Sequence, residues 1–236
     1  MDIFADMRGL NVYSMMFRLL LAMMFGGMIG MERGRKRRAA GFRTYMLVCI
    51  GAALTMILGQ YELMMLKNVW GDVGQQTDVS RFGAQVINGI GFLGAGTVIV
   101  TDKHQVKGLT TAAGLWASAC IGLAVGAGFY ECVIPGLVLV FICVRILPGI
   151  EKNLLKKARN MNVYMELEST EHLGSIIASV KNMDAQICSI ELDRNGGYLD
   201  NVVNAALSIR MKKNREHSLV LAEISANENI RKIEEI

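Results

Sequence analysis

The chain has 236 residues, of which 52% are hydrophobic, and its mean hydropathy is +0.34. This composition is too apolar for an ordinary soluble domain and predicts a membrane protein. The formal net charge of +4 arises in the first 150 residues, which hold 13 Lys and Arg against 8 Asp and Glu. Because this basic excess lies in short loops beside apolar segments, membrane topology accounts for it, and we expect no nucleic-acid partner.

Five segments are long and apolar enough for a membrane-spanning helix, which needs about 20 mainly apolar residues. The sequence therefore predicts a transmembrane domain over residues 1–150 that contacts the lipid bilayer. Its predicted spans are 12–31, 45–65, 83–100, 109–128 and 132–150. A basic linker over 151–160 and a soluble domain over 161–236 are expected to follow.

The loop charges predict the direction of these spans. The loop after the first span carries six basic residues: Arg33, Arg35, Lys36, Arg37, Arg38 and Arg43. A loop this basic stays in the cytoplasm, and the charges of the other loops agree with that choice. The N-terminus is then expected outside and the C-terminal domain inside.

Small residues recur at every fourth position on three of the predicted spans. The three stripes are Gly26-Gly30-Gly34, Gly51-Thr55-Gly59 and Gly114-Ser118-Gly122-Gly126. Residues four apart share a helix face, and small side chains let backbones approach closely in lipid. The pattern predicts tightly packed helices, either within one chain or between copies in a homo-oligomer.

Charged residues inside the spans are candidates for function, because burying them in lipid is costly. Arg18 and Arg145 lie near span ends, and we expect both to extend to the membrane surface. Glu32 is the acid beside the basic loop, and Arg43 begins the second span on the same side. An ion pair between Glu32 and Arg43 would serve structure or function equally well.

Two amides, Gln85 and Asn88, share one face of the third predicted span. Amides in lipid need partners, so they either bond a neighbouring helix or line a hydrated path. The glycine-rich run 89–96 follows on the same span. It is embedded in an apolar helix and not in a βαβ unit, which excludes a dinucleotide-binding loop.

No constellation in the sequence supports catalysis. The five cysteines form no CxxC pair, and no nucleophile–base pair or metal-ligand set is present. We therefore expect no cofactor, no metal site and no enzyme.

The C-terminal region changes to alternating and helical patterns. Val163, Met165 and Leu167 alternate as in a strand, and Leu173 to Val180 follow helical spacing. Further strands are predicted at 188–192, 203–211 and from Ile230, with a turn at 195–197 and a second helix around 221–224. This order, βαββαβ, predicts a ferredoxin-like sandwich.

Several motifs, in this order, resemble the MgtC/SapB family of bacterial inner-membrane proteins. They are Gly30-x-Glu32-Arg33, Ala40-Gly-Phe-Arg-Thr44, Gly51-Ala-Ala53, Arg81 with Gln85-Val86, Gly89-Ile-Gly-Phe-Leu-Gly-Ala-Gly96, and Gly108-Leu-Thr-Thr-Ala-Ala113 with Trp116. Gly114 departs from the family pattern, in which Thr commonly follows this last run. The tail resembles the ACT-like domain of some members.

The resemblance implies a role in growth under magnesium limitation and, in pathogens, in survival inside macrophages (virulence). Similar members are thought to regulate a membrane partner such as ATP synthase, and the family is also labelled as magnesium transporters. The positions that carry over are Glu32, Arg43, Thr44, Arg81, Gln85, Gly91, Gly94, Thr110 and Thr111, to which the amide argument adds Asn88.

Two functions remain open from the sequence. A regulator that binds a membrane partner fits the small-residue stripes and the absence of paired acids within the spans. A magnesium or other small-ion transporter would use Glu32, Gln85 and Asn88 at a hydrated interface, although a magnesium path is expected to offer carboxylates.

Overall fold

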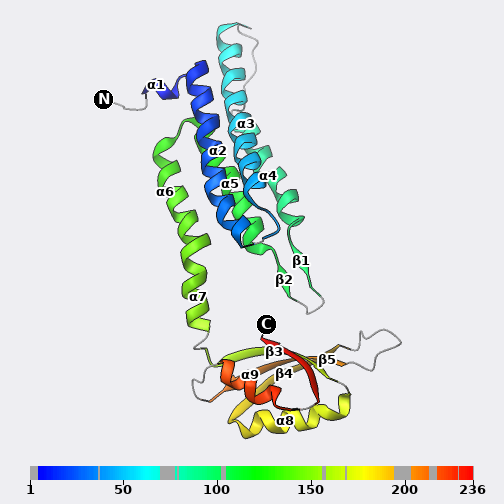
Figure 1. Ribbon diagram of the computed structural model, residues 1–236. Coiled ribbons are helices and arrows are strands. Elements are labelled where there is room, and N and C mark those ends of the chain that lie inside the picture. The colour runs from blue at the N-terminus through cyan, green and yellow to red at the C-terminus, as the bar shows by residue number, and fades with distance from the viewer. Residues whose placement is uncertain are drawn as a thin grey trace. The chain divides into compact units, whose positions relative to one another are not determined.

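The structure is a computed structural model. It describes residues 5–36, 38–69, 78, 80–101, 105–155, 158–167, 169–193, 203–212, 217–227 and 229–235. The chain divides into two compact units, Met1–Pro148 and Gly149–Ile236 (Figure 1).

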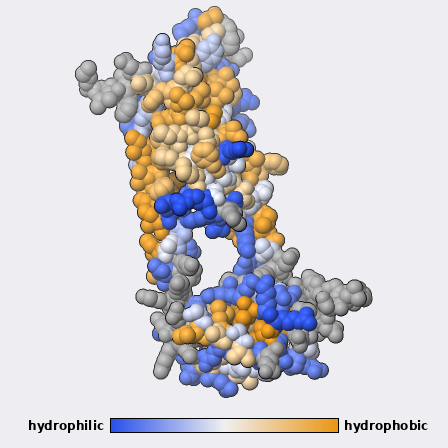
Figure 2. Space-filling view, in the orientation of Figure 1, coloured by the Kyte–Doolittle hydropathy of each residue, from blue (hydrophilic) through white to orange (hydrophobic). Residues whose placement is uncertain are grey.

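Among the described residues, four helices are long and apolar enough to cross a membrane. They are α2 (Val12–Arg35), α3 (Phe42–Asn68), α5 (Leu109–Ala127) and the continuous segment Tyr130–Glu151. That segment comprises α6 (Tyr130–Phe141), a π-helical stretch η1 (Ile142–Ile146) and the start of α7 (Leu147–Leu155). These helices correspond to four of the five predicted spans, and Figure 2 shows a largely apolar surface over this unit.

The third predicted span forms a shorter helix, α4 (Arg81–Ala95). At 15 residues it is roughly 22 Å long by helical rise, less than the thickness of the hydrocarbon core. After it, β1 (Ile99–Val100) pairs antiparallel with β2 (Val106–Lys107). The helix ends earlier than expected because the β-branched run 97–100 favours an extended backbone. A fifth span therefore stays a prediction.

Gly108 fixes the return of the chain from this hairpin into α5. Its φ is +103°, and a Cβ built there would lie 1.9 Å from the Thr97 carbonyl oxygen. Only glycine fits this left-handed position without strain. The hairpin thus places the first turn of α5 directly beside the end of α4.

The core of the membrane unit lies where α5 packs against both α2 and α3, which run side by side in Figure 1. Its buried residues include Ala22, Phe25, Ile29, Tyr45, Cys49, Ala52, Ala53, Leu115, Ala119 and Val125. The helix α6 contributes Val133 to this core, and its Leu137 and Val140 pack against the core while partly buried. A short helix, α1 (Ala5–Arg8), precedes α2.

Glycines bring these three backbones into close contact, as the stripes on α2 and α5 predict. A Cβ on Gly26 would lie 2.6 Å from the Tyr45 carbonyl oxygen, and one on Gly122 would lie 2.3 Å from that of Cys49. The stripe on α3 behaves differently, because a Cβ on Gly51 would meet nothing within 4 Å.

The C-terminal unit has the predicted order of elements, βαββαβ. Its elements are β3 (Asn160–Leu167), a 3₁₀ turn η2 (Thr170–His172), α8 (Leu173–Asn182), β4 (Ala185–Asp193), β5 (Val203–Met211), α9 (His217–Ser225) and β6 (Ile230–Glu235). The turn predicted at 195–197 lies outside the described residues.

The sheet has the strand order β4-β5-β3-β6, and every neighbouring pair is antiparallel. Helices α8 and α9 lie on one face of it (Figure 1). The alternation that predicted β3 and β5 aims Val163, Met165, Leu167, Leu207 and Ile209 into the core. This core also takes in Ile176 and Ile224 from the two helices.

Candidate functional site

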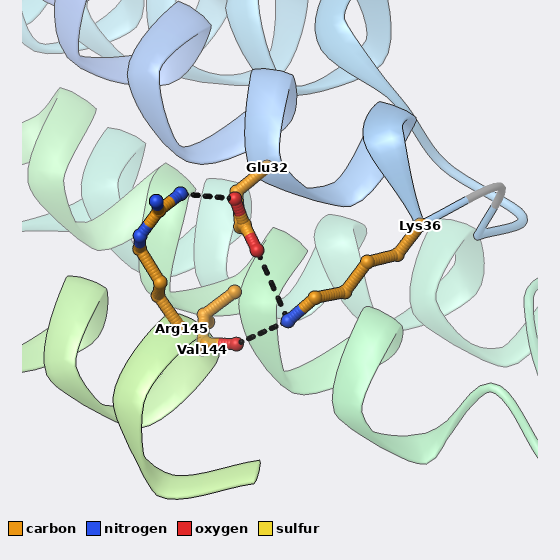
Figure 3. A network of polar contacts seen from close by, with 4 residues as sticks. All are labelled: Glu32, Lys36, Val144 and Arg145. Carbon is orange, nitrogen blue, oxygen red and sulfur yellow. Dashed lines mark hydrogen bonds and ion pairs between the residues drawn. The ribbon is translucent and has the colours of Figure 1, made fainter. Parts of the chain in front are cut away.

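Glu32 is the centre of an ion-pair network at the carboxyl end of α2 (Figure 3). Its side chain is only 9% exposed. Glu32 Oε2 lies 2.6 Å from Arg145 Nη1, and Oε1 lies 3.0 Å from Lys36 Nζ. Lys36 Nζ also donates to the Val144 carbonyl oxygen at 3.4 Å. The network therefore ties the end of α2 to the π-helical segment η1.

One expectation about these charges is wrong. Glu32 pairs with Lys36 and Arg145 and not with Arg43, because Arg43 is exposed on the first turn of α3. The Arg145 side chain is half exposed, and its guanidinium binds Glu32 and lies over the Phe141 ring at 5.7 Å. Its extension to the membrane surface stays a prediction. We name the end of the bundle that carries Glu32, Lys36 and Arg145 the basic end.

A second polar cluster at the basic end joins α2, α3 and α5. Arg33 is 4% exposed, and its Nη2 donates to the Thr111 hydroxyl at 2.6 Å. The Tyr45 hydroxyl donates to the Thr111 carbonyl oxygen at 3.2 Å. A Cβ built on Gly114 would lie 2.5 Å from the Tyr45 hydroxyl oxygen. The Tyr45 side chain therefore occupies the space that a side chain at position 114 would need.

Arg18 lies in the opposite half of α2 and is fully buried, which corrects the expectation that it reaches the membrane surface. It donates to Gln60 Oε1 at 2.8 Å, to the Gly126 carbonyl oxygen at 2.9 Å and to the Met7 carbonyl oxygen at 3.1 Å. Gly126 lies in the last turn of α5, where carbonyl oxygens have no N–H donor within the helix and can accept from the guanidinium. Arg18 thus links α2, α3 and α5 at this end.

The predicted residues of α4 do not join either cluster. Gly94 is buried, with its Cα facing Ala112 of α5, while Arg81, Gln85, Asn88 and Gly91 are exposed. Within the described part of the chain, neither amide side chain has a hydrogen-bond partner. Phe92 continues this surface and is 85% exposed. We call Arg81, Gln85, Asn88 and Phe92 the α4 face.

The other predicted positions also divide into buried and exposed residues. Thr111 is buried against Arg33, whereas Thr44 and Thr110 are exposed. The structure thus brings Glu32 and Thr111 to one end of the bundle, at neighbouring clusters. It leaves the α4 face open to whatever surrounds the helix.

The sequence reasoning missed Lys36, Tyr45, Gln60 and the buried state of Arg33. Lys36 was detectable, because it lies four residues after Glu32 on the same helix. Tyr45 and Gln60 give no local signal, since their partners Thr111 and Arg18 are 66 and 42 residues away in the sequence.

The C-terminal unit also holds a buried histidine, His217, at the start of α9. Its Nδ1 faces a Glu235 carboxylate oxygen, and its Nε2 lies 2.8 Å from the Ala158 carbonyl oxygen. Burial disfavours the charged ring, yet the Ala158 carbonyl and the Glu235 carboxylate together raise the pKa of His217 above its ordinary value. Only the protonated ring can donate to both acceptors.

Comparisons with known proteins match the membrane unit and, in part, the tail. Escherichia coli (strain K12) YhiD is 39% identical over 143 residues, which are 59% of this chain and 63% of YhiD. Protein SapB of Bacillus subtilis is 27% identical over 227 residues, 91% of this chain and 92% of SapB. Protein MgtC of Brucella abortus (strain 2308) is 43% identical over 107 residues, 45% of this chain and 40% of that protein. No solved structure matches the chain.

The match to YhiD covers less than two thirds of its length. A model of the MgtC family matches residues 19–153, which is more than half of the chain. These residues include the Glu32 and Arg33 clusters and the whole of α4. The chain therefore belongs to the MgtC family of membrane proteins.

Proposed function

We propose that this protein is an inner-membrane regulator that supports adaptation to magnesium limitation by binding a membrane protein partner. ATP synthase is the partner that the family resemblance suggests. In pathogens, the same activity would support survival inside host cells. The proposed orientation places the basic end and the C-terminal unit in the cytoplasm, with α4 completing a fifth span and the tail acting as an ACT-like domain.

The α4 face is the observation that carries this proposal. Gln85 and Asn88 have no hydrogen-bond partner in the described structure, and exposed amides facing lipid are unfavourable. A partner helix would satisfy both amides, because each can donate and accept. Phe92 would add an aromatic anchor of the kind that dominates protein interfaces.

A photo-crosslinking amino acid at position 92 tests this proposal in membranes grown in low magnesium. The matched control places it at Leu47, which is 69% exposed on α3. The proposal expects a specific cross-link to an ATP synthase membrane subunit from position 92 and none from position 47. Equal cross-linking from both positions, or none to that subunit, would reject the interface.

Small-ion transport is the second candidate, and the name of YhiD proposes magnesium transport for that protein. The same two amides would then line a hydrated path. Within the described residues, no group of three or more His, Cys, Asp or Glu is arranged to hold a metal ion. Purified protein in liposomes separates the two functions, since only a transporter gives magnesium flux without a partner.

A further inference from the structure

Arg33 is a buried cation to which the structure gives no anion. It is 4% exposed, its Nε has no hydrogen-bond partner, and its Nη2 donates to the neutral Thr111 hydroxyl. The adjacent carboxylate of Glu32 is already held by Lys36 and Arg145. Among the described residues, no carboxylate pairs with Arg33. A guanidinium in this position needs compensating negative charge.

The partner of Arg33, Thr111, lies in the first turn of α5, a helix of 19 residues. This helix has no side-chain cap and no acidic residue in its first turn. The first N–H groups of a helix have no acceptor within it, and the helix dipole makes this end positive. The buried guanidinium of Arg33 and the positive N-terminal end of α5 therefore meet beside Thr111. In other proteins, the N-terminal end of a helix binds phosphate groups.

The surroundings of this point are both basic and apolar. Arg35 and Arg43 are exposed nearby in the chain, and hydrophilic atoms gather at this end of the unit in Figure 2. Leu109, at the start of α5, is 61% exposed, and Phe42, which packs on Gly30 of α2, is 45% exposed. A ligand that carries both a phosphate and acyl chains matches this combination.

We propose that the basic end binds the phosphate of an anionic lipid between Arg33 and the first turn of α5. The N–H groups of Thr111 and Ala112 already donate to the Gly108 carbonyl oxygen, at 2.8 and 2.9 Å. The phosphate therefore accepts from Arg33 and from the N–H groups of Leu109 and Thr110 at the start of α5. Because Arg33 and Thr111 belong to different helices, the bound lipid stabilises the contact of α2 with α5. This site is separate from the α4 face and does not depend on the proposed partner.

Native mass spectrometry of the full chain in detergent tests the proposal, with phosphatidylglycerol as the probe and phosphatidylcholine as the neutral comparison. Arg33→Gln is expected to weaken phosphatidylglycerol binding about tenfold, the effect of one lost charge-assisted contact. The control Lys67→Gln removes one positive charge from an exposed position in the last turn of α3, at the other end of that helix from Phe42, and is expected to change binding by less than about twofold.

Equal losses in both variants, or equal binding of the two lipids, would overturn the proposal. Displacement of phosphatidylglycerol by millimolar inorganic phosphate would show that the site binds a free anion. That result would overturn the proposal that the ligand is a lipid. If Arg33→Gln does not fold, Thr110→Pro provides the second variant, because it removes one first-turn N–H at an exposed position where helices tolerate proline. Unchanged lipid binding in Thr110→Pro would then contradict the site.

Discussion

Glu32 Oε2 lies 2.6 Å from Arg145 Nη1, across 113 residues of sequence, and joins the end of α2 to the π-helical segment η1. Lys36 reaches the same carboxylate and the Val144 carbonyl oxygen next to Arg145. The contact gives α6 and η1 a polar attachment to the bundle, to which they otherwise contribute few buried residues.

A double-mutant cycle on Glu32→Gln and Arg145→Leu measures this attachment. We expect a coupling free energy of about 1 to 2 kcal/mol, since Glu32 is buried but Arg145 is half exposed. Thermal unfolding of the purified protein in detergent gives the four stabilities. Strictly additive effects would show that the pair does not hold η1 in place.

Helix packing makes a sharper prediction at Gly122. A Cβ there would lie 2.3 Å from the Cys49 carbonyl oxygen, so Gly122→Ala forces α3 and α5 apart and is expected to cost about 1 to 3 kcal/mol. Gly136→Ala on α6 meets nothing within 4 Å and is expected to be neutral or stabilising. Unfolding midpoints of the two variants check this contrast, and similar midpoints would refute the close approach.

The Tyr45 hydroxyl occupies the space beside Gly114, and a pair of substitutions tests this fit. Gly114→Ala places a methyl group against the Tyr45 hydroxyl and is expected to lower the unfolding midpoint. Tyr45→Phe in the same chain removes that oxygen and should restore part of the loss. No rescue in the double variant would mean that the hydroxyl is not what excludes a side chain at position 114.

The C-terminal unit is expected to be more stable at mildly acidic than at alkaline pH. The pKa of His217 is raised in the folded state, so its contribution is fully present below its unfolded pKa and is lost as pH rises through the folded pKa. Hydrogen exchange of β6 in the full chain, at pH values between about 6 and 8, measures this effect.

The variant His217→Gln serves as its control, because glutamine does not titrate. It should flatten the pH dependence of β6 protection. A dependence that persists unchanged in this variant would assign the effect to other groups.

Much of the fold could be predicted from the sequence because its signals are local. The length of the apolar segments predicted α2, α3, α5 and the α6–α7 segment. The alternation of apolar with polar residues predicted β3 and β5. The end of α4 was missed because the apolar run continues past Ala95, while the β-branched residues after it take the backbone into β1.

The polar contacts were harder to predict, because they join positions far apart in the sequence. Lys36 could have been paired with Glu32 from helical spacing, but Arg145 could not. Buried Arg18 donates to the carbonyl oxygen of Gly126, 108 residues away. Such contacts follow from how the helices pack, and a span pattern alone does not contain that information.

The central claim, regulation through a membrane partner, is tested most directly in liposomes that contain ATP synthase with and without this chain. ATP-driven proton pumping is the measurement, and magnesium uptake is recorded in the same vesicles. The account predicts that the chain lowers pumping, that Asn88→Leu on the α4 face restores it, and that Leu47→Ala on α3 does not. Unchanged pumping together with magnesium uptake that requires Asn88 would contradict the account and establish transport.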